Sequence, residues 1–405
     1  MRRLLARRDA RIYLTGQVFS LFGDSCLWLA MGVWVRSLTG SNAQAGLVFF
    51  FYTAPSLLAP AFGLLADRVR RRSLLLAANA LTAVAVLSLL AVHGRGQVWL
   101  IDAVMFAYGV SAQVIGPAQS ASLTIIVPAE LLADANAAFR TVQEGLRLAG
   151  PLAGAALFVA VGPHVITVVD AATFAFPVVS LLLLRVREPA PHPAEGGWAS
   201  QVAAGVRHIW QAPELRQIVV AGACMTTVFG FTETTIYAIV TDGLHRPAAF
   251  IGVTGAVQGI GALAGGLTAA PLVRKAGEGR LAGLAMLTAA AGVALTILPL
   301  LPLVIAGLVV FGAAIPWLVV ALMTLAQRLT PPQLQGRVFA AVEVLITTPQ
   351  TLSIALGAAL ITIVGYQALL AAMAVVFAAT AVSVLTRPEQ RRPRGLGVSG
   401  AGLRL

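Results

Sequence analysis

The sequence has 405 residues, of which 58% are hydrophobic and 11% are charged. A soluble domain carries about a quarter charged residues, so this chain has too few of them to cover a surface in water. The high hydrophobicity excludes a disordered chain, and two cysteines in apolar stretches, Cys26 and Cys224, exclude a disulfide-bonded secreted scaffold. The composition therefore indicates a polytopic membrane protein, in which twelve helices of about 20–25 residues would occupy most of the chain.

The net charge of +12 can indicate a nucleic-acid partner. Here, however, the basic residues form short clusters between apolar segments, which is typical of the cytoplasmic loops of membrane proteins. The sequence contains no nucleic-acid-binding motif and no basic face interleaved with aromatic residues. We therefore expect no nucleic-acid partner.

The first apolar run follows five arginines between positions 1 and 11. A signal peptide begins in the same way, but the run at 13–35 is too long for one, so it predicts a membrane helix. In chain order, the apolar segments predict helices at 13–36, 43–66, 73–92, 98–126, 139–161, 164–185, 216–241, 249–272, 281–299, 302–327, 336–364 and 366–386. The longest loop, 187–215, is rich in proline and glycine and is predicted as a linker.

These segments predict an all-α membrane protein with twelve transmembrane helices in two pseudo-symmetric six-helix bundles. The N-terminal bundle is expected at 1–186, the cytoplasmic linker at 187–215, and the C-terminal bundle with a short basic tail at 216–405. A substrate site between such halves is one known plan of membrane transporters.

Arginine and lysine are distributed unequally between the two sides of the predicted helices. The loops on one side hold Arg36, Arg95 and Arg246, whereas the other loops and both termini hold most of the remainder. Because cytoplasmic loops are enriched in these residues, both termini should be cytoplasmic, in a multi-pass protein of the cell (inner) membrane.

The two halves also repeat each other in sequence. Residues 127–131 and 330–334 open two similar segments, which end in the same four residues at 154–157 and 357–360. Both ends of this match share a spacing of 203 residues. One spacing kept over about thirty residues indicates a parallel repeat of six plus six helices.

A charged motif, GLLADRVRRR, lies at 63–72, at the end of the second predicted helix. It resembles the signature loop of the major facilitator superfamily, G-x-L-a-D-R-x-G-R-R/K, but arginine replaces the family's second glycine, which permits a tight turn. The resemblance implies a cytoplasmic gate formed by Gly63, Asp67, Arg68, Arg71 and Arg72. The alternative is an ordinary cluster of positive charges in a cytoplasmic loop.

A second motif lies in the fifth predicted helix and contains Gly150, Pro151 and Gly154. It resembles the G-P-x-x-G element of the antiporter branch of that superfamily. Proline bends a helix, and glycines four residues apart allow another helix to approach closely. The resemblance favours export, and ordinary packing of small residues is the alternative.

Other short segments are similar to the branch that contains macrolide and siderophore exporters. They lie at 23–24, 127–157, 170–174 and 336–339. The resemblance implies efflux of drugs, macrolides or siderophores, and with it multidrug resistance. The fourth predicted helix departs from the antiporter pattern, because it lacks an arginine in its first turns.

Three carboxylates, Asp24, Glu233 and Glu343, lie inside predicted membrane helices. An ionised side chain at a helix centre costs about 2.5–3.5 kcal/mol on insertion scales. Each group could therefore be protonated in one state and ionised in another, as a proton-coupled exporter requires. The alternative is that each is neutral and hydrogen-bonded for packing alone.

Helical spacing groups these carboxylates with other polar and aromatic residues. Gln17, Asp24 and Trp28 share one face of the first predicted helix, and Glu233 and Tyr237 share one face of the seventh. Since these helices open the two halves, the two faces could meet at the centre. The candidate proton and substrate site thus consists of Asp24, Glu233, Glu343, Gln17, Trp28 and Tyr237. Its acidic and aromatic lining suits neutral or cationic amphiphiles.

The sequence has no P-loop, no metal-ligand spacing and no nucleophile elbow, so we expect no enzyme, no cofactor and no metal. We expect a secondary transporter, a monomer in the lipid bilayer, that exports small amphiphilic compounds in exchange for protons or another coupling ion. One alternative is an importer with the same fold. The other, from a different class, is a membrane-embedded transferase or a receptor that transports nothing.

Overall fold

The computed structural model describes residues 7–58, 62, 69–127, 129–184, 198–331 and 334–386, and within these ranges the chain is helical with no strand. The first part consists of α2 (Arg8–Thr39), α3 (Asn42–Thr53), η1 (Ala54–Leu58), α5 (Arg71–Leu87), η2 (Ser88–Ala91), η3 (Arg95–Gln97), α6 (Val98–Ile126), α7 (Ala129–Val161), α8 (Pro163–Thr173) and α9 (Ala175–Leu183). The second part consists of α10 (Trp198–Gln211), α11 (Pro213–Ala238), η4 (Ile239–Gly243), η5 (Ala248–Phe250), α12 (Ile251–Ala276), α13 (Glu278–Thr296), α14 (Leu301–Leu329), α15 (Gln335–Leu360) and α16 (Tyr366–Thr386).

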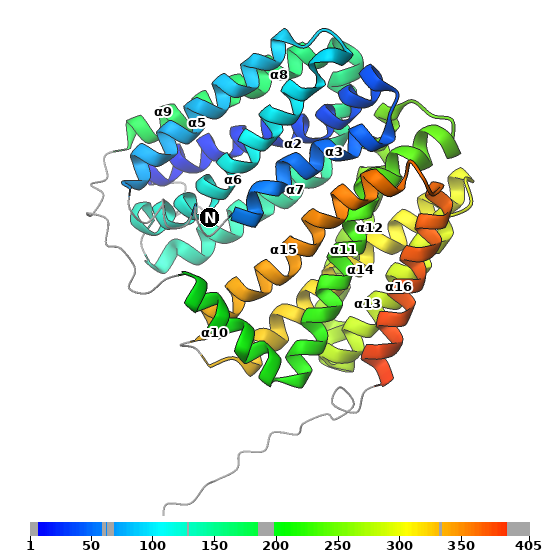
Figure 1. Cartoon of the computed structure of the whole chain (residues 1–405). Helices are drawn as coiled ribbons and strands as arrows, with labels where there is room; N and C mark the ends of the chain where they lie inside the picture. The colour runs from blue at the N-terminus through cyan, green and yellow to red at the C-terminus, as the bar shows by residue number, and fades with distance from the viewer. Residues whose placement is uncertain are drawn as a thin grey trace, which may run out of the picture.

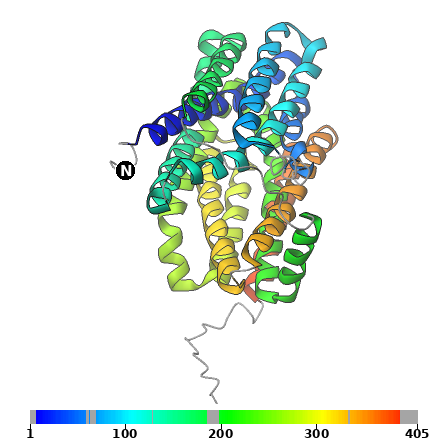
Figure 2. The same ribbon diagram turned by 90° about the vertical axis from the view of Figure 1, so that its left-hand side faces the viewer.

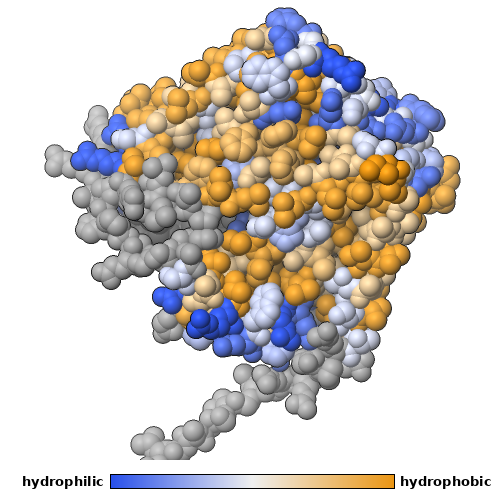
Figure 3. Space-filling model, in the orientation of Figure 1, coloured by the Kyte–Doolittle hydropathy of each residue, from blue (hydrophilic) through white to orange (hydrophobic). Residues whose placement is uncertain are grey.

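The outer surface is that of a membrane protein. Ten of the described helical segments are long and apolar enough to cross a bilayer. Large apolar side chains such as Leu81, Val159 and Leu267 are 70%, 72% and 81% exposed, which water would disfavour and lipid does not. Figure 3 shows apolar side chains in a broad band, with hydrophilic side chains gathered at the upper right and at the bottom. The chain is thus a multi-pass membrane protein.

Two of the twelve predicted spans are not among these ten segments. The second prediction, 43–66, begins with α3 and η1, and most of its remainder lies outside the described residues. The fifth prediction, 139–161, falls within α7, which carries five charged residues before Leu148 and whose apolar part is short, Leu152–Val161. The count of twelve therefore stays a prediction.

Two segments of the structure contain helix that hydropathy does not predict. α7 begins at Ala129, ten residues before the predicted start. The predicted linker, 187–215, contains the helix α10 (Trp198–Gln211), which buries Ile209 completely and packs Gly205 against the backbone of α15. Both segments are amphipathic, so their charged faces lower the mean hydropathy of the segment. Each is nevertheless helical, because its apolar face packs against other helices.

The helices form two groups, α2–α9 and α10–α16. Figure 1 shows the first group in blue to teal and green above the second in green to red, and Figure 2 keeps the same order after a quarter turn. In Figure 1 the groups come together where α3 and α11 lie side by side, near the α2–α3 connection. We call this the distal end, because the N-terminus of α2 and the C-terminus of α16 lie away from it.

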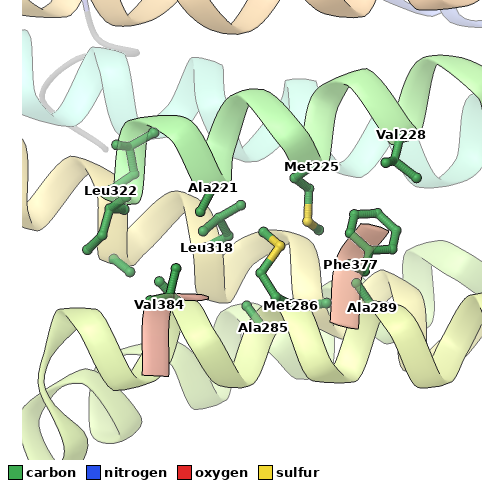
Figure 4. Close-up of a cluster of buried hydrophobic side chains, with 14 of the residues drawn as sticks. Ala221, Met225, Val228, Ala285, Met286, Ala289, Leu318, Leu322, Phe377 and Val384 are labelled. Atoms are coloured by element: carbon green, nitrogen blue, oxygen red, sulfur yellow. The ribbon is translucent and has the colours of Figure 1, made fainter. Parts of the chain in front are cut away.

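Each group has its own apolar core. In the second group, Met225 of α11, Met286 of α13, Leu322 of α14 and Phe377 of α16 are at most 4% exposed. Figure 4 shows Met225 and Met286 pointing toward each other between the helices, with Leu322 and Phe377 on either side of them. Alanines such as Ala285 fill the positions where the helices approach most closely.

The sequence repeat has a counterpart in the helix packing. Gly154 of α7 lies so close to the backbone of Cys26 in α2 that a Cβ would collide with it. At the matching place, Gly357 of α15 packs against Phe231 of α11. Each half therefore packs its fifth predicted helix on its first through a glycine at the same position of the repeat.

The spacing of 203 residues extends beyond this pair. α6 and α14 both have 29 residues, and they begin 203 residues apart, at Val98 and Leu301. α8 and α16 also begin 203 residues apart, at Pro163 and Tyr366. The two halves can therefore be compared residue by residue over these helices.

Candidate functional site

Asp24 lies at the centre of a small polar cluster within the first group of helices. It is half-buried in α2 and accepts a hydrogen bond from the Tyr108 hydroxyl of α6. Tyr52, at the end of α3, interacts electrostatically with the same carboxylate. Trp28, one turn along α2, packs edge-on against Tyr52 with ring centroids 4.5 Å apart. The structure thus brings two predicted residues, Asp24 and Trp28, together with two tyrosines.

A second carboxylate, Asp170 of α8, belongs to this cluster and is absent from the predicted site. Its side chain interacts electrostatically with Asp24. Helix α8 approaches α2 so closely at Gly23 that a Cβ there would meet the Asp170 Oδ1 atom at 2.5 Å. An aspartate inside an apolar helix was the signal that identified Asp24, and the same signal exists for Asp170 in the predicted helix 164–185.

Gln17 belongs to a different polar contact. It is 2% exposed and accepts a hydrogen bond of 2.5 Å from the Gln119 amide of α6. The Tyr13 hydroxyl donates to the backbone carbonyl of Gln119 at 3.2 Å. This contact lies about two turns of α2 from Asp24, so the structure does not bring Gln17 into the Asp24 cluster.

Tyr237 of α11 lies at the junction between the two groups of helices. Its side chain is fully buried against Gly32 of α2, and its ring centroid lies 6.4 Å from that of Phe49 in α3. Its hydroxyl has no hydrogen-bond partner among the described residues. Phe49 also packs on Trp28 at 4.8 Å, so it connects Tyr237 to the Asp24 cluster.

The other two predicted carboxylates lie outside the Asp24 cluster. Glu233 is half-buried one turn before Tyr237 and interacts with it electrostatically. Glu343 is exposed on α15 and accepts a hydrogen bond of 3.3 Å from the Thr347 hydroxyl one turn further on. The structure therefore unites Asp24 with Trp28, and Glu233 with Tyr237, and leaves Glu343 apart.

Most of the predicted cytoplasmic gate cannot be placed. Gly63, Asp67 and Arg68 lie outside the described residues. Arg71 and Arg72 open α5, and the Arg72 guanidinium donates to the Leu182 carbonyl of α9 at 3.2 Å.

The predicted antiporter element lies directly beside the Asp24 cluster. Gly150 of α7 packs against Ser25, and Gly154 packs against Cys26, the two residues that follow Asp24 in α2. The backbone at Pro151 is part of α7, and its side chain lies outside what the structure describes. This glycine face fixes α7 against the segment of α2 that carries the carboxylate.

Four polar side chains join the two groups at the distal end, and we call them the distal latch: Arg36, Asn42, Thr241 and Asp242. The Arg36 guanidinium pairs with Asp242 at 3.7 Å and donates to Asn42 Oδ1 at 2.7 Å and to Thr241 Oγ1 at 3.3 Å. The Asn42 amide donates to Asp242 Oδ2 at 2.8 Å. The latch therefore crosses from α2 and α3 to η4.

An apolar cluster lies below the distal latch and also crosses between the groups. It includes Val33, Phe49, Tyr237, Ile251 and Ile354. Gly46 of α3 packs against Thr234 of α11 at the same junction. The two groups are thus closed upon each other at the distal end by polar contacts above and apolar contacts beneath.

We expect Arg36→Met to loosen the distal latch without opening it fully. An exposed ion pair contributes about 0–1 kcal/mol and a hydrogen bond about 0.5–1.5 kcal/mol, so the distal end should open more often by roughly tenfold. Hydrogen–deuterium exchange of the α2–α3 connection and of η4 should become faster. Arg95→Met, at an exposed arginine of η3, is the matched control and should change neither segment. Equal exchange in both variants would contradict a role for the latch.

One known family matches nearly the whole chain. Residues 7–392 match the family described as transmembrane secretion effector. Macrolide efflux protein A of Streptococcus pyogenes is 24% identical over 174 residues, which are 42% of this chain and 43% of that protein. The protein of the same name from Streptococcus pyogenes serotype M6 matches equally. The chain thus matches less than half the length of these curated relatives.

Solved transporters show the same fold. A bacterial homologue of the iron transporter ferroportin, in its inward-facing state, is 14% identical with a TM-score of 0.70, and the match covers 94% of this chain and 99% of that one. The nucleoside transporter NupG is 13% identical with a TM-score of 0.73, and the match covers 92% of this chain and 99% of that one. The predicted major facilitator fold and the similarity to macrolide exporters are therefore confirmed, and the chain belongs to the transmembrane secretion effector family.

Proposed function

We propose that this protein is a secondary exporter that exchanges small amphiphilic compounds for protons by alternating access. The observation that supports this proposal is Asp24, a half-buried carboxylate that is hydrogen-bonded to Tyr108 and has no Lys, Arg or His partner in the described part of the chain. A carboxylate in such surroundings is neutral when it holds a proton and costly when it does not. It can therefore couple proton binding to a change between two arrangements of the helices.

The proposal assigns the distal end to the outer side of the membrane. The excess of arginine in the other loops and both termini supports this orientation. With the distal end closed, the substrate site would then face the cytoplasm, and the two halves, 1–186 and 216–405, would rock about the contact between α3 and α11. Asp67 and Arg68 would close the cytoplasmic side in the opposite arrangement.

The substrate class follows from the groups around Asp24. Trp28 and Tyr52 offer aromatic faces, which attract cations and pack on apolar rings. A cationic amphiphile can also neutralise the carboxylate in place of the proton, so the two would compete for one site. The macrolide efflux proteins among the relatives favour a macrolide as one such substrate.

The proposal is tested in everted membrane vesicles energised with ATP, so that the lumen becomes acidic. Addition of ethidium or of the macrolide erythromycin should release part of the pH gradient and accumulate the probe inside. Vesicles without the protein are the control. Accumulation that a protonophore leaves unchanged would contradict proton coupling, and uptake from outside into intact cells would identify an importer.

A further inference from the structure

Asp170 is a buried carboxylate to which the proposed function assigns no role. It is 1% exposed, and neither of its side-chain oxygens accepts a hydrogen bond within the described residues. The ion pairs of this part of the chain do not include it. An ionised carboxylate without any partner costs several kcal/mol in an apolar interior, roughly the stability of a whole domain. Among the described residues nothing offsets a negative charge on Asp170, so we expect this carboxyl group to hold or share a proton.

Two observations place the Asp170 carboxylate next to Asp24. Its Oδ1 atom lies over Gly23, the residue before Asp24, where glycine leaves room for it. Tyr108 interacts electrostatically with both carboxylates and donates its hydroxyl proton to the bond with Asp24. The two aspartates thus face the same hydroxyl from two different helices, α2 and α8.

The second half shows that the fold does not need these polar groups. At the spacing of 203 residues, Phe311 matches Tyr108 and Met373 matches Asp170. The side chain that contacts Phe311, as Asp24 contacts Tyr108, is Phe229 of α11, with ring centroids 6.2 Å apart. Phe311 and Met373 are each 4% exposed and belong to the apolar core of the second group. The same helix contact is therefore stable with apolar side chains, so packing alone does not account for two carboxylates.

Among the side chains that the structure describes, the remaining titratable groups around the pair are neutral or weakly acidic. Tyr52 interacts with Asp24, Cys26 interacts with Asp170, and Tyr108 interacts with both. None of these three can supply a positive charge. Interaction between two carboxylates in an apolar site disfavours ionisation of both, and a single shared proton is the smallest ligand that relieves this repulsion.

We propose that Asp24 and Asp170 form one proton-binding unit, in which a single proton is held between their carboxyl groups and Tyr108 is hydrogen-bonded to the pair. The proposal rests on the proposed function and adds Asp170 to it. On loading, a proton from water on the distal side forms an O–H bond with one carboxylate, which donates a hydrogen bond to the other. On release, that O–H bond breaks and the proton passes to water on the cytoplasmic side.

The test uses the full-length protein in proteoliposomes with ethidium as the probe, an imposed pH gradient and the membrane potential clamped at zero. One proton exchanged for one monovalent cation changes the accumulation ratio about tenfold per unit of pH difference. Asp24→Asn, Asp170→Asn and the double variant should all lose this response equally, because the pair acts as a unit. Asp102→Asn, at another carboxylate of α6, is the matched control and should keep it.

Asp170→Met protects the test against a folding defect, because methionine fills the matching position in the second half. This variant should elute from a size-exclusion column as a folded protein, and its ethidium accumulation should still no longer depend on the pH gradient. A second readout is infrared spectroscopy, in which Asp24→Asn and Asp170→Asn should remove the same carboxylic acid C=O band.

The outcomes separate this proposal from the proposed function. If Asp24→Asn loses proton coupling and both Asp170 variants keep it, the shared site is wrong and the exporter stands. The same conclusion follows if the single variants lose separate infrared bands. If the wild-type protein and every variant accumulate ethidium independently of the pH gradient, proton-coupled export itself is wrong.

Discussion

Replacing Gly46 with leucine should move the protein away from the arrangement in which the distal end is closed. Gly46 of α3 faces Thr234 of α11 across the junction between the halves, and even a Cβ would overlap the threonine side chain. Thr234 is fully buried, and its Cα lies only 3.2 Å from the position of that Cβ, so rotation of the threonine side chain does not remove the overlap. Overpacking of this kind costs about 1–3 kcal/mol, which changes the ratio of two states by about 5- to 150-fold.

The opening is measured by labelling a cysteine at Ala155, which is 5% exposed in the apolar cluster beneath the distal latch. The background replaces Cys26 and Cys224 with serine, and a membrane-impermeant maleimide is added from the distal side. Labelling should be faster in Gly46→Leu. Gly96→Leu is the control, because a Cβ at Gly96 meets no atom within 4 Å. Equal rates in the two variants would show that the junction does not close as described.

Gly154→Leu should destabilise the N-terminal half itself. Here the obstacle is the backbone of Cys26, which cannot rotate away, so α7 must separate from α2. We expect a cost at the upper end of about 1–3 kcal/mol, a large part of the stability of an ordinary domain. The folded fraction of detergent-solubilised protein that survives heating, followed by size-exclusion chromatography, should fall at a lower temperature than in the wild type.

The same helix supplies a control for this variant. Gly145 lies nine residues earlier in α7, and a Cβ there meets no atom within 4 Å. Gly145→Leu should leave the thermal midpoint unchanged or raise it, because leucine favours a helix more than glycine does. If the two variants melted together, the close contact between α2 and α7 would not be a source of stability.

Hydropathy predicts most of these helices well, because lipid-exposed helices are apolar on nearly every face. The predictions 98–126 and 366–386 coincide with α6 and α16. Hydropathy fails to predict the start of α7 and α10. Both are polar on one face, so their average hydropathy resembles that of a loop. Those helices depend on contacts with other elements, such as Gly205 against α15, and a local average cannot detect them.

The candidate site could be predicted only in part, for a similar reason. Asp24 stands out as a charge within an apolar run, and so does Asp170 once each predicted helix is searched by the same rule. Their association with Tyr108 depends on how α2, α6 and α8 pack, which no spacing along the chain reveals. Gln17 was predicted from the same helical face as Asp24, yet it bonds Gln119 instead, because α6 presents a different partner at each turn.

The hydroxyl of Tyr237 has a consequence for how easily the carrier can reverse. Together with the side-chain oxygens of Gln44 and Thr234, it is buried without a hydrogen-bond partner in the described part of the chain. Each such group costs about 1–3 kcal/mol, and water entering the separated surfaces would restore its bond. The closed contact between the two halves is therefore less stable than it would be with these three hydrogen bonds formed. Because the closed conformation is only moderately stable, a modest electrochemical gradient can open it repeatedly. An interface with every hydrogen bond formed would hold the carrier in one conformation.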